Sequence, residues 1–553
     1  MGRHISGRHR MVSVVALGPA LLFALSCGAE RKPEAPAGSR PLLDGLSEHH
    51  MEITTSSPVA QRYFDQGIRL VYAFNHDEAI RAFEAAQKLD PECSMCYWGV
   101  ALALGPNINA PMEPSAVPRA FEALGKAVER APKASLREQA YVSALAARYS
   151  DKPDADRAAL DLAYANAMRA VAKSDPGDLD AATLFAEALM DLTPWAYWTK
   201  TSEPTQYTAE IVAEIERVLA VDPNHPGANH YYIHAVEASN EPGKALPSAK
   251  RLESLAPTAG HLVHMSAHTY MRVGRYHDAS VANERGARAD EAYMAWCKSG
   301  GFYTLAYYPH NLHFLWASEA FEGRSAASLA TAKKLSEQIS ADAARQTPPA
   351  HELYAVRYFA PVRFGKWEQA LAEPAPPDDL RYALGMQHWA RGMALAATGK
   401  VDEAGAEHVA LAAISQEDAV KQLAFLEGPA SQLLEIASHV LAAEIASKRG
   451  NHDAALAELE AAQRVEHALH YTEPPPWPIP VRHYQGAALL DAGRAAEAET
   501  VFREDLREYP ENGWALYGLA ASLRAQKKPA DEVDQRFAAA WAAGDVKLTS
   551  SRF

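Results

Sequence analysis

The 553-residue chain contains four cysteines and no internal apolar run of membrane-spanning length. So few cysteines exclude a scaffold held together by disulfides, and a packed core must provide the stability. Basic residues are also scarce, with 54 Lys and Arg against 69 Asp and Glu and a net charge of -15. Because nucleic-acid binding depends on clustered Lys and Arg, we expect no nucleic-acid partner.

Familiar catalytic motifs are missing as well. The sequence has no P-loop, no GxSxG, no HExxH and no dinucleotide-binding fingerprint, which removes the usual signatures of several enzyme classes. The chain is instead rich in alanine, and 48% of its residues are apolar. This composition indicates a helical body with a substantial core.

The first 27 residues have the character of an export signal. Arg3, Arg8 and Arg10 precede an apolar stretch that ends at Cys27, as in a signal peptide. The sequence ALSC at this point resembles a bacterial lipobox, which implies a lipid on Cys27 as the membrane contact; ordinary secretion is the alternative. Residues 28–55 are expected to be a flexible tether. The predicted location is the cell envelope, in the periplasm or at the outer membrane, or outside the cell.

Repeated helix–turn–helix units follow the tether. In the first unit, Gly67 permits close helix contact, Phe83 fills the gap between units and Pro91 ends the second helix. Gly486 and Phe502 repeat this pattern near the C-terminus. Between them, glycines that suit the left-handed end of a helix precede alanine-rich segments at Gly274, Gly323, Gly365, Gly399, Gly450 and Gly493.

These features resemble the tetratricopeptide-repeat (TPR) family over nearly the whole mature chain. The resemblance implies an all-α, right-handed solenoid of about a dozen units with insertions. We expect residues 56–350 to carry a groove and residues 351–553 to end in a capping helix. The segments YAFNHDEA, CSMCYWG and ENGW also resemble exported bacterial TPR lipoproteins with His-rich helices, a group with no assigned reaction.

Seven histidines follow the repeat between Asn224 and His313. Two of them recur 34 residues later, which is the length of one TPR unit, and two recur 49 residues later. The TPR resemblance implies that all seven lie on first helices, at positions facing the concave groove. Since histidine makes up 22 of 553 residues, chance placement does not explain them. The set is His230, His234, His261, His264, His268, His310 and His313.

Such a set predicts a metal site in the groove, because neutral imidazole is the commonest side-chain metal ligand. Copper is the first expectation for imidazole-rich ligation in an envelope protein, with zinc or iron as alternatives. Glu187 and Asp191, one unit upstream, are candidates for a ligand, a supporting partner or a general base. The ion could then serve a hydrolytic or oxidative reaction.

The alternative hypothesis is a non-catalytic scaffold that binds an extended peptide in the groove. In that case the histidines would be polar or pH-sensitive contacts. The seven positions carry no Lys or Arg, which such grooves normally use to hold a carboxylate. This composition favours the metal hypothesis.

The remaining cysteines allow several interpretations. Cys93 and Cys96 lie where one helix is expected to end and the next to begin. A local disulfide, redox-active or metal-binding thiols, and plain structural thiols are all compatible with that spacing. Cys297 has no obvious partner and is interpreted as a buried apolar residue, with a metal ligand as the alternative.

Overall fold

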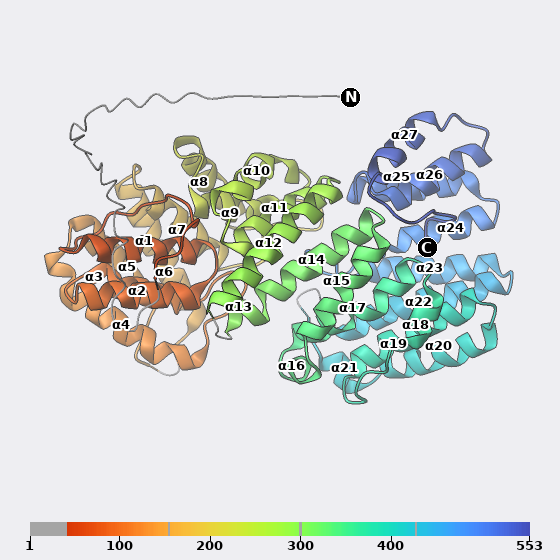
Figure 1. Cartoon of the computed structure of the whole chain (residues 1–553), viewed down its shortest axis with the longest axis horizontal. Helices are drawn as coiled ribbons and strands as arrows, with labels where there is room; N and C mark the ends of the chain where they lie inside the picture. Colours follow the sequence, from red (N-terminus) through yellow and green to blue (C-terminus); the bar gives the residue numbers. More distant parts are fainter. Residues whose placement is uncertain (1–40, 153–154, 298–300, 426–427) are drawn as a thin grey trace, which may run out of the picture.

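The computed structural model describes residues 41–152, 155–297, 301–425 and 428–553 (Figure 1). The predicted signal peptide, Cys27 and the first part of the tether lie outside these residues. The described chain is helical and forms no strand there beyond isolated bridges. None of its helices is long and apolar enough to cross a membrane.

Antiparallel helix pairs follow one another along the chain, as predicted. The first half contains α1 (Pro58–Tyr72), α2 (His76–Leu89), α3 (Ser94–Ala103), α4 (Val117–Arg130), α5 (Leu136–Ala146), α6 (Arg157–Ser174), α7 (Leu179–Met190), α8 (Thr208–Val221), α9 (Pro226–Val236), α10 (Leu246–Leu255), α11 (Gly260–Arg272) and α12 (Tyr276–Cys297). Short 3-10 helices are η1 (Pro114–Ala116), η2 (Ala131–Lys133) and η3 (Pro242–Ala245).

The second half continues the same alternation. It contains α13 (Phe302–Leu305), α14 (Tyr307–Phe321), α15 (Ser325–Gln338), α16 (Ala341–Gln346), α17 (Pro348–Arg363), α18 (Trp367–Ala372), α19 (Arg381–Ala397), α20 (Val401–Ser415), α21 (Asp418–Gln422), α22 (Ala430–Lys448), α23 (His452–Glu466), α24 (Val481–Asp491), α25 (Ala495–Glu508), α26 (Gly513–Ala525) and α27 (Asp531–Ala540).

The predicted packing of a phenylalanine against glycines is present at both ends of the array. A Cβ atom on Gly67 would lie 2.4 Å from the ring of Phe83, and one on Gly99 of the next unit 2.6 Å from it. Gly486 and Gly518 stand in the same relation to Phe502. Because the ring occupies the space that any side chain there would need, it fixes the spacing of successive units.

One large buried core cluster extends across residue 350 without a break, and a small second cluster contains Ala320, Phe364, Trp514 and Leu548. Leu335 of α15, Phe359 of α17 and Trp389 of α19 all belong to it, and α15, α17 and α19 pack in succession. Helices on both sides of residue 350, the boundary expected between the stretches 56–350 and 351–553, therefore share this core in the described chain.

Residues 41–55, the last part of the expected flexible tether, are packed against the protein instead. Residues 41–55 lie against the first helices, with Met51 1% and Ile53 7% exposed. The Met51 N–H donates to Asp65, and the Thr54 N–H donates to Glu138. The physical reason is that this segment carries apolar side chains, which are more stable when buried.

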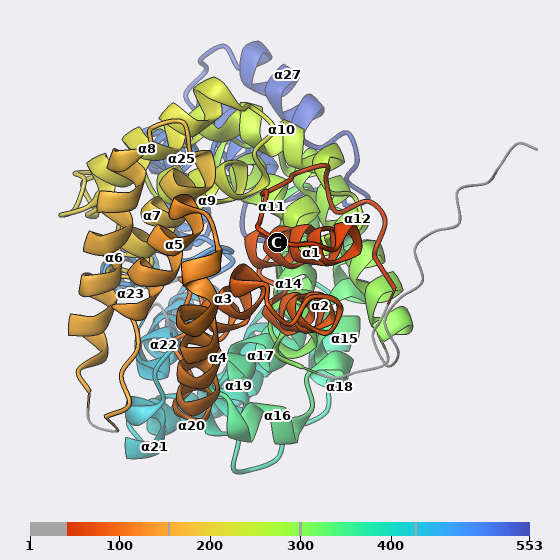
Figure 2. The same ribbon diagram turned by 90° about the vertical axis from the view of Figure 1, so that its left-hand side faces the viewer.

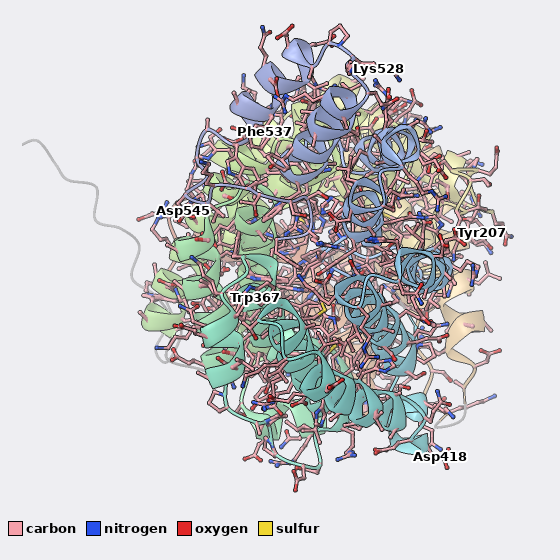
Figure 3. All side chains as sticks on the ribbon, turned by 90° about the vertical axis from the view of Figure 1, so that its right-hand side faces the viewer. Tyr207, Trp367, Asp418, Lys528, Phe537 and Asp545 are labelled. Carbon is pink, nitrogen blue, oxygen red and sulfur yellow. A yellow bond between two sulfur atoms is a disulfide. The ribbon has the colours of Figure 1, made fainter. Side chains whose placement is uncertain are left out.

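The C-terminal units fold back onto the middle of the chain (Figure 1). Trp514 donates through Nε1 to the Ala320 carbonyl of α14 at 2.9 Å, and Trp541 packs against Gly323. Asp545 accepts hydrogen bonds from the Ser325 and Ala326 N–H groups at the start of α15, on the face shown in Figure 3. The last units thus dock onto turns near the histidine-bearing helices.

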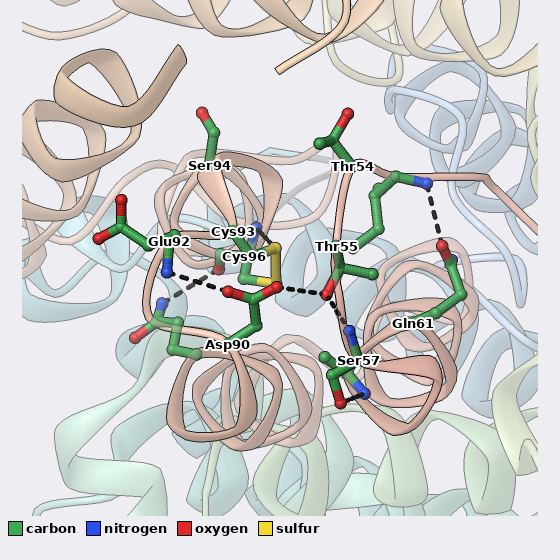
Figure 4. The surroundings of a disulfide bond; sticks show 12 residues. Thr54, Thr55, Ser57, Gln61, Asp90, Glu92, Cys93, Ser94 and Cys96 are labelled. Atoms are coloured by element: carbon green, nitrogen blue, oxygen red, sulfur yellow. Dashed lines mark hydrogen bonds between the residues drawn. A yellow bond between two sulfur atoms is a disulfide. The ribbon is translucent and has the colours of Figure 1, made fainter. Parts of the chain in front are cut away.

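The disulfide interpretation of Cys93 and Cys96 is confirmed, since their sulfur atoms lie 2.03 Å apart (Figure 4). Both residues are buried at the start of α3. Next to them, Asp90 accepts hydrogen bonds from Thr55 and from the Glu92 N–H. Cys297 is buried, as expected, and its Sγ lies 3.6 Å from the Tyr293 hydroxyl and 3.9 Å from Glu78 Oε2.

Candidate metal centre

Three successive first helices bring the histidines together. Residues four positions apart on a helix share one face, so His230 and His234 point the same way from α9, and His264 and His268 do so from α11. Helix α14 adds His310. Helix α1 lies beside α9 although about 150 residues separate them in the chain (Figure 2). It covers the histidine-bearing helices on the α9 side.

His264, His268 and His310 form one set, here called the α11–α14 group. One ring nitrogen of each lies within 4.8 Å of the corresponding atoms of the other two. The Nε2 atoms of His264 and His268 are only 3.1 Å apart. Both residues are fully buried, whereas His310 is partly exposed.

The far side of each α11 ring is held by an oxygen atom. His264 Nδ1 lies 2.7 Å from Asn283 Oδ1, and His268 Nδ1 lies 2.6 Å from Glu237 Oε2. These oxygens accept hydrogen bonds, so each Nδ1 carries the proton and a neutral ring presents a bare Nε2 lone pair. With both protons on Nδ1, the two lone pairs lie 3.1 Å apart, and a metal ion or a proton shared by the rings would stabilise them.

His230, His234 and His261 form a second set, the α9–α11 group, with the same spread of ring nitrogens. His230 and His261 face each other through Nε2 atoms 3.2 Å apart. His230 Nδ1 donates to the Tyr72 carbonyl at 2.7 Å, and His234 Nδ1 donates to Glu237 Oε1 at 2.8 Å. Within the described chain, His234 Nε2 and His261 Nδ1 are buried without a hydrogen-bond partner.

Glu237 connects the two groups, because its two oxygens accept from His234 of one and His268 of the other. Burial alone would raise the pKa of Glu237, but His268 and His234 lower it to about 2. Glu237 is therefore ionised and accepts both hydrogen bonds. A carboxylate on the Nδ1 side of a metal-ligating histidine is a recurring arrangement that fixes the ring orientation and raises its basicity.

The electrostatic environment keeps most of these rings neutral. Burial, followed by the charge of neighbouring histidines, lowers the pKa of His230, His261, His264 and His310 well below 6.5. Burial also lowers the pKa of His234, although Glu237 opposes it. Neutral imidazole is the form that ligates metals.

Aromatic rings surround the histidines. Ring centroids of Phe74 and His230 are 4.5 Å apart, those of Tyr307 and His261 4.7 Å, and those of Phe314 and His268 4.2 Å. Such a shell limits solvent access and lowers the local dielectric constant.

A cleft of about 870 Å³ adjoins this shell. Trp195 lines the cleft, and its ring centroid is 5.1 Å from that of His234. Arg272 and Glu473 line the same cleft, and Arg272 donates to the Glu237 carbonyl. The insertion containing Glu473 thus forms one wall of the cleft beside the histidines.

Three of the predicted site residues lie outside both groups. His313 stacks on Trp316 with a centroid distance of 5.6 Å, and burial lowers its pKa to about 4. Asp191 pairs with the buried guanidinium of Arg148. Burial and then Asp191 raise the pKa of Glu187, and burial raises that of Asp191 to about 6 despite Arg148. These carboxyl groups form their own buried cluster.

A third set, His49, Asp180 and His225, has similar spacing but different chemistry. His225 Nδ1 accepts from the Ala228 N–H, so the Nε2 of a neutral ring carries the proton and faces Asp180. Asp180 also accepts from Tyr72 and bonds to His49 Nε2 at 2.9 Å. Its carboxylate therefore has partners already, and nothing in the set calls for a metal.

Sequence reasoning missed four residues of the centre: Glu237, Asn283, Tyr72 and Phe74. Glu237 carried a usable signal, because it follows His234 by three residues and so shares its helix face. Asn283 comes from the partner helix α12, and Tyr72 contributes a backbone carbonyl that no side-chain pattern reveals. Only the packing of α1 and α12 against the groove brings these groups to the histidines.

Comparison with known proteins gave only low similarities to solved structures. No family model and no curated protein sequence matches it. Among solved structures, a human IFIT1 dimer with m7Gppp-AAAA is 11% identical, with a TM-score of 0.31 over 89% of this chain and 92% of that one. Yeast Tom70 is 15% identical (TM-score 0.26; 88% and 92% covered), and the P58(IPK) TPR domain is 12% identical (0.22; 85% and 98%).

The fold is a TPR-type helical solenoid. The helix pairs and the glycine–phenylalanine contacts of the chain itself support this assignment. Similarities this low carry no activity, ligand or partner to this protein, so its function has to be argued from the histidine groups.

Proposed function

We propose that this solenoid is a metal-binding protein whose histidine groove holds a transition-metal ion. The observation that carries the proposal is the pair of Nε2 atoms of His264 and His268, which face each other at 3.1 Å while Nδ1 of each ring is held by an oxygen. Two nitrogens that ligate one tetrahedral ion at about 2.0–2.1 Å lie roughly 3.3 Å apart.

A shared proton is the competing explanation for this contact. It would place a charged imidazolium in a buried site, where desolvation disfavours the charged form. His310, whose ring centroid is 4.9 Å from that of His264, has no role in that arrangement. A metal ion uses all three nitrogens and leaves a coordination position for water or another ligand.

Copper is the first choice of metal, with zinc and iron as alternatives. Imidazole ligands suit all three ions. Glu237, which contacts the rings through His234 and His268, brings one negative charge. A Cu(I) ion adds a single positive charge and so costs less desolvation in this buried site than a divalent ion. An enzymatic role would use the ion as a Lewis acid, a water activator or a redox centre.

The test is metal retention by purified mature protein. Metal-free protein is exposed to Cu, Zn and Fe salts, desalted, and analysed for bound metal by mass spectrometry. We expect stable retention of one of these metals, and loss of the ion held by the α11–α14 group in His264→Gln/His268→Gln. The matched control is His388→Gln/His439→Gln, because His388 and His439 bond Glu407 and Glu458 through Nδ1 at 2.6 Å in the same way. Wild-type protein that retains none of the three metals would refute the proposal.

A second candidate function is peptide binding by the scaffold. The cleft of about 870 Å³ is its specific support, since Trp195, Trp198 and Tyr471 line it together with several prolines. Aromatic and proline-rich walls suit an extended chain. A peptide that binds metal-free protein, and that Trp195→Ala releases, would support this function independently of the metal.

A further inference from the structure

The α9–α11 group is a complete three-histidine set of its own. His230, His234 and His261 each offer a ring nitrogen within 4.8 Å of the others, and none of them belongs to the α11–α14 group. All three residues are less than 3% exposed. A single ion on His264, His268 and His310 would leave these three rings without a function.

The orientation of these rings matches that of the first group. His230 and His234 both donate through Nδ1, to the Tyr72 carbonyl and to Glu237. Both therefore present bare Nε2 atoms, and that of His234 is buried without a partner in the described structure. A buried nitrogen lone pair without a partner is costly, and a cation would satisfy it.

The geometry points to two metal ions in the groove, one on His230, His234 and His261 and one on His264, His268 and His310, with Glu237 bonded to both sets. This inference rests on the proposed metal-binding function and adds a second ion to it. The ligand class is a late first-row transition ion that accepts three imidazoles, such as copper or zinc.

Glu237 has a distinct position in this arrangement. His234, Glu237 and His268 also lie within 4.8 Å of one another, but the Nδ1 hydrogen bonds of both rings occupy the carboxylate oxygens. We therefore assign Glu237 as a positioning residue that orients one ligand of each ion. Its single negative charge also offsets part of the positive charge at both sites.

The two ions would be close neighbours. Ring centroids of His234 and His268 are 5.2 Å apart, and those of His261 and His264 are 5.7 Å apart. Paramagnetic ions held by these rings would interact magnetically. A pair of Cu(II) ions should therefore give a different electron paramagnetic resonance signal from one isolated ion.

The experiment measures bound metal per chain with Cu(II) and, separately, Zn(II) as probes. Wild type should retain two ions. His230→Gln/His261→Gln and His264→Gln/His310→Gln should each retain one, and the control His388→Gln/His439→Gln should retain two. Glutamine replaces histidine so that volume is roughly kept, and circular dichroism confirms that each variant is folded.

Spectroscopy provides a readout that does not depend on the variants folding well. Wild-type protein loaded with Cu(II) should give a broadened or diminished resonance signal relative to its copper content. Protein loaded with a small fraction of copper and an excess of zinc should recover the signal of isolated Cu(II). If protein with two Cu(II) ions per chain gives a narrow signal whose integrated intensity accounts for all the copper, the two ions are not close neighbours and the inference is wrong.

The outcomes separate the two proposals. One ion in wild type, lost in both histidine variants, would show a single shared site and overturn the second ion while leaving the proposed function intact. No retained ion in wild type would refute both. Two ions that persist in either histidine variant would place the metal elsewhere and also overturn the inference.

Discussion

The protonation pattern of individual imidazoles decides what the histidines of this protein can bind. An oxygen on the Nδ1 side fixes the proton there, and the opposite Nε2 is then free to ligate. His230, His234, His264 and His268 all have such an oxygen. His225, whose Nδ1 accepts a backbone N–H instead, shows how the same residue type serves a purely structural role.

Glu237→Gln should weaken metal binding by about 10- to 100-fold, the usual effect of removing such a carboxylate partner. Glutamine has one carbonyl oxygen, so it can accept from His234 or His268 but not from both. Competition with a chromophoric chelator measures the affinity. The control Glu407→Gln, which changes the partner of His388, should leave the metal affinity unaltered. Equal losses of affinity in both variants would contradict the role of Glu237 in orienting the ligands.

Asp290→Asn should change how stability depends on pH. Burial raises the pKa of Asp290 from 3.8 to about 7, against the hydrogen bonds from Tyr303 and Asn311. A carboxyl group with a raised folded-state pKa contributes stability that is full below pH 3.8 and is lost as the pH rises through 7. Asparagine does not ionise, so the Asp290→Asn variant should not lose this stability as the pH rises.

Relative to wild type, the free energy of unfolding of Asp290→Asn should therefore rise by about 2 kcal/mol between about pH 5.5 and 7.5. Asn311 can turn its amide to accept from the new side chain, because its Oδ1 is buried without a partner in the described structure. Urea unfolding at several pH values measures the effect, and parallel pH profiles would contradict it.

At the scale of elements, the turns between paired helices do more than reverse the chain. Gly274 has φ +77°, and a Cβ atom there would lie 2.3 Å from the Pro510 carbonyl oxygen. Gly399 has a similar φ of +86°, but a Cβ atom added to it would meet no atom within 4 Å. The two turns thus share their backbone conformation and differ in what docks on them.

Gly274→Ala should destabilise the protein more than Gly399→Ala. Both substitutions incur the cost of a left-handed conformation, about 1–2 kcal/mol, and Gly274→Ala adds an overlap with the Pro510 backbone of roughly 1–3 kcal/mol. Chemical unfolding measures both. If both variants lose the same free energy of unfolding, the contact between Gly274 and Pro510 contributes little to stability.

At the scale of the whole molecule, the C-terminal units close the solenoid onto its middle. Trp541 packs on Gly323 and on Trp514, with a centroid distance of 5.1 Å to the latter. The tail beyond α27 then brings Asp545 to the start of α15. Glu473, in the segment before α24, lines the same cleft as Arg272 of α11.

Trp541→Ala should loosen this docking and lower stability by roughly 2–4 kcal/mol, since a large, partly buried ring and its packing contacts are lost. Hydrogen exchange should accelerate at the Ser325 and Ala326 amides, which Asp545 otherwise protects. The control is Phe121→Ala, at a ring that is 41% exposed. It should change neither the stability nor the exchange rate of the Ser325 and Ala326 amides. Unchanged exchange in Trp541→Ala would show that the tail docks without the tryptophan.

Much of the architecture was predictable because its signals are local. Gly67, Phe83 and the turn glycines follow the repeat, and each acts through neighbours in the next unit. The histidine positions were predictable for the same reason, since the repeat period places them on matching helix faces. The packing of residues 41–55 was not, because Met51 and Ile53 find their partners on surfaces that exist only after folding.

The sequence by itself determined the helix pairs, their glycine and phenylalanine contacts, and the concentration of histidines on α9, α11 and α14. Tertiary structure alone decided how those histidines divide into two groups and why His313 stands apart. The physical reason is that ring orientation depends on partners from distant helices: the Tyr72 carbonyl of α1, Asn283 of α12, and Glu237, which meets His268 only where α9 and α11 pack together.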